Sequence, residues 1–184
     1  RDLTRIEDVD RLEHLIRLLN PRIASPLSIN SLREDLDVAF ETVRGWIHTL
    51  ERLYYVYGVP PYSKRLQRAI KREQKYYYWD WSEVKDESAR FENMIISHLL
   101  KTCHTWSDFG LGEFELWYVR DREKREVDAL VTRDNQTWML VEVKLNDLNV
   151  SKSLQRFAGL LNCNKIVQVV GPDNVYRQVR VGQQ

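Results

Sequence analysis

Residues 138–145 read Trp-Met-Leu-Val-Glu-Val-Lys-Leu, an apolar and partly β-branched stretch that carries two charges two positions apart. Because side chains alternate between the two faces of a strand, Glu142 and Lys144 are expected on one face and their apolar neighbours on the other. Burying charged side chains on so apolar a strand costs free energy unless they form ion pairs or take part in a functional site. The stretch therefore predicts a core β-strand with a polar site on one face. The alternative is a solvated strand face with a cross-strand lysine pair.

A second apolar stretch, Glu-Val-Asp-Ala-Leu-Val at 126–131, comes just before it, and the turn-forming residues 133–136 join the two. Together they predict a β-hairpin. A three-residue loop centred on Asn135 would place Asp128 directly opposite Glu142. A two-residue loop would shift the register and send the two carboxylates to opposite faces. The candidate site depends on the first of these registers, which is our working prediction.

Two adjacent carboxylates and a lysine are the groups that a metal-dependent phosphodiesterase requires. Hard divalent cations such as Mg²⁺ bind one or two carboxylates together with water and substrate phosphates. A lysine beside them adds positive charge where a phosphoryl transition state becomes more negative. The triplet Glu-x-Lys is not specific by itself, because it recurs at 83–85 in a polar stretch. The copy at 142–144 differs in lying in an apolar strand behind a hairpin partner with its own isolated aspartate.

The composition describes a globular chain that is long enough for one full core or two small domains. Charged residues make up 30% and the net charge is only +1, which argues against coating nucleic acid by bulk charge but leaves room for a local basic patch. Cys103 and Cys163 form no metal-binding or disulfide pattern, so we expect a cytoplasmic location. No apolar run approaches the ~20 residues of a membrane span. The chain begins without methionine, and we expect it to be part of a longer protein.

Residues 1–62 are expected to form a winged helix-turn-helix. Apolar spacing predicts a first helix that Pro21 ends, a second at 29–36 and a third from Phe40 to about 50, followed by a strand at 54–57. Ser28 is the expected N-cap of the second helix. If this unit binds DNA, the candidate contacts on the third helix are Thr42, Arg44 and His48.

The charge of this unit favours a different role. Eight Arg and no Lys stand against five Asp and five Glu, which gives −2 over residues 1–62. A DNA phosphate is repelled by such a balance. The alternatives to DNA contact are therefore packing, docking of a partner, or homo-oligomerisation through this unit.

Residues 63–75 are expected to be a basic linker or helix, and a second domain is expected over 76–184. The basic segment carries +5 in thirteen residues and is the best candidate in the chain for binding nucleic acid, through Lys64, Arg65, Arg68, Lys71, Arg72 and Lys75. An aromatic strand at 76–81 opens the second domain. A long helix from Asp86 to about Cys103 places Glu92 on its buried face, where a carboxylate needs a partner.

The remaining elements complete an α/β order. A strand is expected at 113–120 before the hairpin, a helix capped by Ser151 after it, a buried strand at 165–170, and an edge strand at 175–181. Gln155, on the first turns of the helix after Ser151, is a weak candidate for substrate contact.

The order of helix with Glu92, strand, strand with Asp128, strand with Glu142 and Lys144, helix and strand resembles the PD-(D/E)xK nuclease superfamily over residues 76–184. Val127 stands where that family usually has proline. The whole chain resembles, more narrowly, the C-terminal region of prokaryotic AAA-type P-loop ATPases. The stretches that carry this resemblance are Val-Pro-Pro-Tyr-Ser at 59–63, Lys-Tyr-Tyr-Tyr-Trp-Asp at 75–80, Arg-Phe-Glu-Asn at 90–93, Arg-Glu-Val-Asp at 125–128 and Leu-Val-Glu-Val-Lys at 140–144.

The resemblance implies a restriction-endonuclease-like mixed sheet flanked by helices, behind a winged helix. It implies that Asp128, Glu142 and the Val143 carbonyl bind Mg²⁺, or Mn²⁺ in its place, that Lys144 and Glu92 complete a catalytic site, and that the substrate is DNA, or RNA as the alternative. ATP would be bound only by an ATPase domain preceding this chain, since the chain has no P-loop motif. The alternative is a non-catalytic module that binds nucleic acid or protein and regulates that ATPase.

Overall fold

The computed structural model describes residues 6–63 and 73–178. It is a mixed α/β structure with two sheets. In chain order its elements are α1 (Ile6–Leu19), a 3₁₀ turn (Asn20–Arg22), α2 (Ile29–Leu36), α3 (Phe40–Arg52), β1 (Val56–Val59), β2 (Lys75–Tyr78), a second 3₁₀ turn (Trp81–Glu83), α5 (Glu87–Asp108), β3 (Phe114–Arg120), β4 (Glu126–Arg133), β5 (Gln136–Lys144), α6 (Lys152–Leu161) and β6 (Ile166–Val170).

The N-terminal helices form where their caps and apolar spacing predict. The hydroxyl oxygen of Ser28 accepts a hydrogen bond from the Ser31 backbone N–H, and α2 has the predicted bounds. In α1, Leu15 and Leu19 are buried, whereas Val9 is 44% exposed. Strand β1 begins two residues later than predicted, since Tyr54 adopts a left-handed φ of 55° that no strand accommodates.

Strand β2 belongs to the N-terminal sheet. The aromatic segment at 76–81, which we assigned to the opening of the second domain, pairs antiparallel with β1, so that Tyr77 lies opposite Tyr57 and Lys75 lies opposite Val59. Farther along, Pro60 and Tyr62 exchange backbone hydrogen bonds with Tyr118 of β3. These bonds attach the N-terminal unit directly to the edge of the larger sheet.

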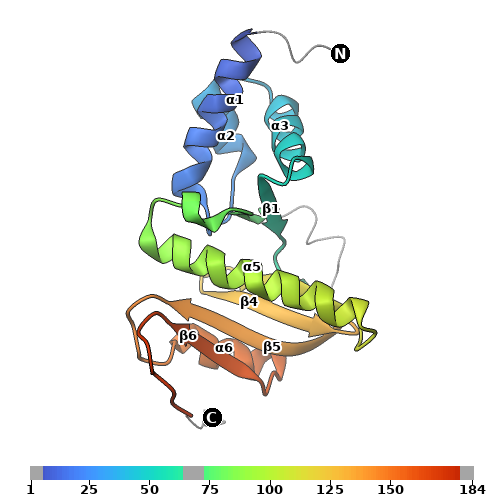
Figure 1. Ribbon diagram of the computed structural model, residues 1–184, viewed down its shortest axis with the longest axis vertical. Helices are drawn as coiled ribbons and strands as arrows, with labels where there is room; N and C mark the ends of the chain where they lie inside the picture. Colours follow the sequence, from blue (N-terminus) through green and yellow to red (C-terminus); the bar gives the residue numbers. More distant parts are fainter. Residues whose placement is uncertain (1–5, 64–72, 179–184) are drawn as a thin grey trace.

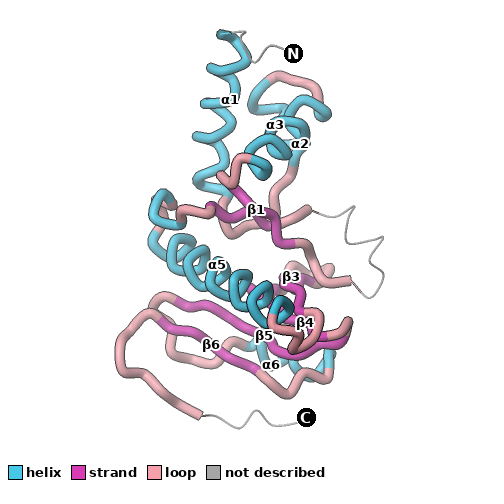
Figure 2. The backbone as a smooth tube through the Cα atoms, turned by 45° about the vertical axis from the view of Figure 1, so that its right-hand side comes forward, coloured by secondary structure: helices cyan, strands magenta, loops and turns pink. Residues whose placement is uncertain are grey.

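The larger sheet has the strand order β3-β4-β5-β6, with antiparallel pairs up to β5 and a parallel pair between β5 and β6. Helix α5 covers one face, where Ile96 joins the core of Val131 and Val141. Helix α6 covers the other face, where Phe157 packs with Leu140. Figure 1 shows α5 lying between the N-terminal helices and the sheet, and the turned view in Figure 2 shows the same stacking.

The hairpin has the predicted register, but its turn differs from the predicted one. The predicted three-residue loop is wrong, because Arg133 pairs with Gln136 across a two-residue turn. One extra residue of β5, Trp138, then forms a bulge between the Thr132–Thr137 and Val131–Met139 pairs, and Ala129 lies opposite Val141. The bulge restores the pairing that the three-residue loop would have given, so Asp128 comes beside Glu142.

The turn itself gives a testable consequence. Asp134 and Asn135 have φ values of 51° and 61°, as a type I′ hairpin turn requires. Asn135→Val should lower the free energy of unfolding by about 1–2 kcal/mol, because a β-branched residue is strained in this conformation. Asn135→Gly is the matched control and should be neutral or stabilising in urea unfolding. Equal stability of both variants would contradict the turn.

Several predicted boundaries need correction or cannot be compared. Helix α5 continues five residues past Cys103 and ends at Asp108. Residues 175–178 form no strand, and the rest of the predicted edge strand lies outside the described residues. The predicted basic contacts fall there as well, namely Lys64, Arg65, Arg68, Lys71 and Arg72. In the described ranges, no helix has the length and apolar character that crossing a membrane requires.

Candidate functional site

The site forms where β4 and β5 separate. A second bulge places two residues of β4, Asp128 and Ala129, opposite the single residue Tyr118 of β3. The ladder between β4 and β5 ends at Ala129 and Val141. Beyond it the Asp128 carboxylate accepts the Val143 backbone N–H at 2.8 Å, in place of a strand neighbour. Bulges often redirect a side chain beside a functional site, and this one turns Asp128 into the split between the strands.

Glu142 and Lys144 form the second half of the site. The Lys144 ammonium lies 2.8 Å from Glu142 Oε1. Glu142 is 3% exposed, whereas the Lys144 side chain is 39% exposed. The second carboxylate oxygen, Oε2, is buried and has no hydrogen-bond partner among the described residues. A buried carboxylate oxygen without a donor is costly, and it becomes favourable on taking up a cation or a proton.

The electrostatics of Glu142 agree with that arrangement. Burial is the main cause that raises the pKa of Glu142, and the nearby Asp128 carboxylate raises it further. The Lys144 ammonium and the Ser151 hydroxyl act in the opposite direction. The site therefore has an excess of negative charge that its own lysine does not fully compensate.

Lys75 supplies the other cation of the site, and our prediction that it belongs to a basic surface segment is wrong. Its side chain is 1% exposed. The ammonium lies 2.6 Å from Glu126, 3.1 Å from Glu92 and 3.5 Å from Asp128. Burial acts to lower the pKa of Lys75, but the three carboxylates together hold it above its usual range. Lys75 is therefore charged, and its ion pairs connect the N-terminal sheet to the carboxylate cluster.

Glu92 finds its partners on β2. The sequence indicated that this carboxylate needs a partner. Its Oε1 accepts hydrogen bonds from the Lys75 ammonium and from the Tyr77 hydroxyl, the latter at 2.9 Å. Burial raises the pKa of Glu92 to about 7, while the Lys75 ammonium lowers it. The helix carboxylate is thus held by the N-terminal unit.

Asn93 fixes β2 on α5 and so determines where Lys75 lies. It is fully buried, accepts the Tyr78 N–H at 2.8 Å and donates to the Tyr78 carbonyl at 2.9 Å. Asn93→Ala should reduce the free energy of unfolding by about 2–4 kcal/mol, because two buried backbone groups lose their partner. Urea unfolding measures the loss, with Asn149→Ala in an exposed loop as control. A loss below about 0.5 kcal/mol in Asn93→Ala would contradict this role.

The donor set fits a single hard cation better than a larger cluster. Among the described residues, and with the Lys75 ammonium in place, no three His, Cys, Asp or Glu side chains are arranged to hold a metal ion. Asp128 and Glu142, with the Val143 carbonyl between their strands, nevertheless provide oxygen ligands of the kind Mg²⁺ takes. The unpartnered Glu142 Oε2 is the atom that such an ion would satisfy.

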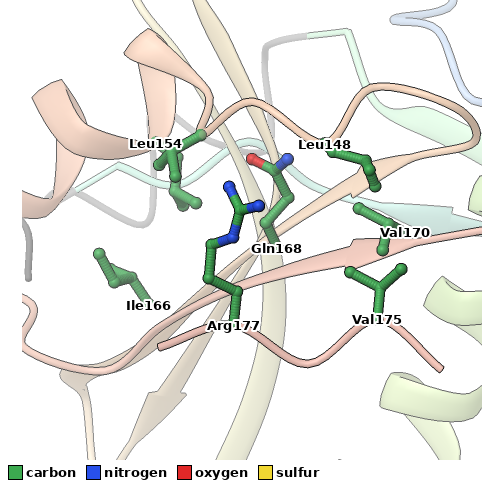
Figure 3. Close-up of a pocket in the computed structure, with 8 residues that line it drawn as sticks. Leu148, Leu154, Ile166, Gln168, Val170, Val175 and Arg177 are labelled. Carbon is green, nitrogen blue, oxygen red and sulfur yellow. The ribbon is translucent and has the colours of Figure 1, made fainter. Parts of the chain in front are cut away.

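The sequence did not identify Gln168, which lies beside Glu142 in the parallel ladder. Its amide accepts the Ser151 N–H and donates to the Asp147 and Asn149 carbonyls, which fixes the loop before α6. Gln168 also lines a pocket of about 140 Å³ (Figure 3). In Figure 3 it extends from β6 and Arg177 from the C-terminal segment, among largely apolar side chains. None of the carboxylates lines this pocket.

The other predicted contacts lie on α6 and α3. Gln155 is exposed, and its amide donates to the Val150 carbonyl at 3.4 Å. On α3, Thr42 is half-buried, and the exposed Arg44 guanidinium pairs with Glu41 at 2.9 Å. His48 lies 3.6 Å from Glu51. On α3, Arg44 and His48 thus each have an acidic neighbour.

Two family models match the chain, both described as domains of unknown function. DUF8612 matches residues 1–83 and DUF4143 matches residues 87–182. The first match ends just after β2, so it includes Lys75, and the second includes Glu92, Asp128, Glu142 and Lys144. No curated protein and no solved structure matches the chain.

Proposed function

The chain belongs to the family described as Domain of unknown function (DUF4143), and we propose that this region is a PD-(D/E)xK nuclease-like domain. In this proposal it binds one divalent cation, Mg²⁺ or Mn²⁺, and hydrolyses phosphodiester bonds of DNA. The element order supports it: α5 with Glu92, β4 with Asp128, and β5 with Glu142 and Lys144, followed by α6 and the parallel strand β6.

The single observation that carries the proposal is the buried, unpartnered Oε2 of Glu142, next to a lysine and near a second carboxylate. A buried carboxylate oxygen without a protein donor at hydrogen-bond distance is uncommon, because protein interiors satisfy nearly all their polar atoms. A bound divalent cation would supply positive charge that binds and polarises the phosphate.

The remaining roles belong to the chain's own side chains. Asp128 is oriented by the Val143 N–H, so its other oxygen is free of backbone contacts. Lys144, which reaches solvent, donates to a phosphate oxygen or orients the attacking water. Glu92 is a positioning residue, because Lys75 and Tyr77 fix its carboxylate. Gln155 remains a weak candidate for contacting DNA.

The N-terminal unit extends the proposal. We propose that α1, α2, α3 and the β1–β2 pair are a winged helix, with DNA bound by the basic segment and by Thr42 and Arg44. DUF4143 is commonly found in proteins associated with AAA-type ATPases, which supports a preceding ATPase domain as an intramolecular partner. Under this proposal the chain is cytoplasmic, and ATP acts only through that domain.

Incubation of the chain with supercoiled plasmid tests the proposal. Nicking should require Mg²⁺ or Mn²⁺ and should disappear in Asp128→Asn, which preserves the shape of the side chain. Asp108→Asn, at the exposed end of α5, is the control and should nick like the wild type. Nicking by Asp128→Asn at the wild-type rate would refute the assignment.

A second candidate function rests on Lys75. Because its ammonium already occupies the space between three carboxylates, the domain could serve as a non-catalytic module that binds nucleic acid and regulates an ATPase. In that case no nicking occurs, while DNA binding is lost when Lys64, Arg65, Arg68, Lys71 and Arg72 are all replaced by glutamine. Loss of binding in Arg44→Ala instead would assign DNA contact to α3.

A further inference from the structure

We infer that Lys75 is a resident cation of the site, a positioning residue that occupies the place of a second metal ion and limits the site to one. This inference rests on the proposed function, because it concerns how many ions the carboxylates of that site can take. It assigns a role in the site to a residue of the N-terminal unit, outside the family match at 87–182.

The contacts of the ammonium carry the first step. Three carboxylates from two elements converge on one nitrogen, with Glu92 on α5 and both Glu126 and Asp128 on β4. A side chain that is only 1% exposed is shielded from solvent, so these attractions are weakly screened. Oxygen atoms from several carboxylates around one point are the surroundings that a hard cation takes. Lys75 thus fills a cation position with a covalently attached charge.

The second step is the division of oxygens between the two halves of the site. Asp128 presents Oδ1 to Lys75 and Oδ2 to the Val143 N–H, while Glu142 has no contact with Lys75 and keeps Oε2 unpartnered. The carboxylate oxygens that face Lys75 therefore have a cation, whereas Glu142 Oε2 lacks one. A chain that holds Lys75 in place has room for one divalent ion, bound through Glu142.

The third step concerns how Lys75 is held. Strand β2 is anchored to α5 by Asn93, and the chain next to β1 is anchored to β3 by the bonds of Tyr118. The Tyr118 ring also lies 5.7 Å from the Lys75 ammonium. The same residue faces the bulge that redirects Asp128. Docking of the N-terminal sheet and the geometry of the metal-binding carboxylate therefore depend on shared contacts.

Mn²⁺ titration by calorimetry, at neutral pH, tests the inference with four chains: wild type, Lys75→Met, Glu142→Gln and the double variant. The wild type should bind one ion, and Lys75→Met should bind two. The double variant should keep one ion, because the additional ion is held by Glu92, Glu126 and Asp128. Lys85→Met removes an exposed lysine and should leave one ion. Circular dichroism establishes which variants are folded.

If Lys75→Met does not fold, Lys75→Gln, whose amide can donate to the same carboxylates without a charge, replaces it in the same titration, with the same expected extra ion. One ion in the wild type and still one in a folded Lys75 variant would overturn the inference and leave the proposed function standing. No ion in the wild type but one in Lys75→Met would support Lys75 as the resident cation and refute the proposed metal-dependent function. No ion in any folded chain would overturn both.

Discussion

Lys144→Ala is expected to reduce DNA nicking by at least about 10²–10³-fold, the usual effect of removing a group that stabilises charge in a transition state. The Lys144 side chain is exposed enough to meet a substrate, yet its ammonium is positioned by the buried Glu142 carboxylate. Its loss should therefore affect the chemical step more than the fold. Initial rates of plasmid nicking, at saturating Mg²⁺, measure the effect.

The second Glu-x-Lys triplet provides a matched control for this variant. Lys85→Ala removes an exposed lysine from the same local sequence pattern, outside the apolar strand. It should nick at the wild-type rate, and circular dichroism should show that both variants are folded. A fully active Lys144→Ala would remove Lys144 from the site, and equal losses in both variants would indicate a general effect of charge on DNA binding.

Lys75→Met is expected to lower the free energy of unfolding by about 3–5 kcal/mol at neutral pH. Removing one partner of a buried ion pair leaves uncompensated charge, here on Glu92 and Asp128 around a side chain that is 1% exposed, whereas Glu126 keeps the Arg120 guanidinium at 2.7 Å. Urea unfolding measures the loss, and Lys85→Met is again the control. A loss below about 1 kcal/mol would mean that the three carboxylates do not depend on Lys75.

The pH dependence of this loss has a definite sign. The Lys75 ammonium lowers the pKa of Glu92, which burial has raised to about 7, so its removal should raise that pKa further. A carboxyl whose pKa is higher in the folded than in the unfolded state binds more protons when folded, and its contribution to stability improves as the pH falls. The deficit of Lys75→Met relative to the wild type should therefore shrink as the pH falls toward about 7, the pKa of Glu92 in the wild type. A deficit that stays constant as the pH falls would contradict the assignment.

Local signals in the sequence were sufficient for most helices and for the strands of the larger sheet. Ser28 and Ser151 cap helices where expected, and the alternation around Glu142 predicted a strand that the structure contains. The hairpin shows the limit of such signals. Turn residues indicated where the chain reverses, but neither the two-residue loop nor the compensating bulge at Trp138 follows from composition.

Lys75 could not be placed from charge alone, because a basic residue at the end of a basic segment has the pattern of a solvated one. The informative feature was the position of Lys75 within its strand. Lys75 and Tyr77 are two positions apart in β2, so they share a face, and both reach Glu92. Recognising this required knowing that β2 lies against α5, which is a tertiary contact between segments far from the hairpin. The sequence indicated that Glu92 needs a partner, but it did not indicate that β2 provides that partner.

Titration of Mn²⁺ into the wild-type chain and into Glu142→Gln tests the central claim most directly, since it measures binding by the unpartnered carboxylate itself. The account predicts one ion per wild-type chain, one for the control Glu83→Gln in the second Glu-x-Lys triplet, and none for Glu142→Gln. Absence of binding by the folded wild type, or unchanged binding by Glu142→Gln, would contradict a cation site at Asp128 and Glu142.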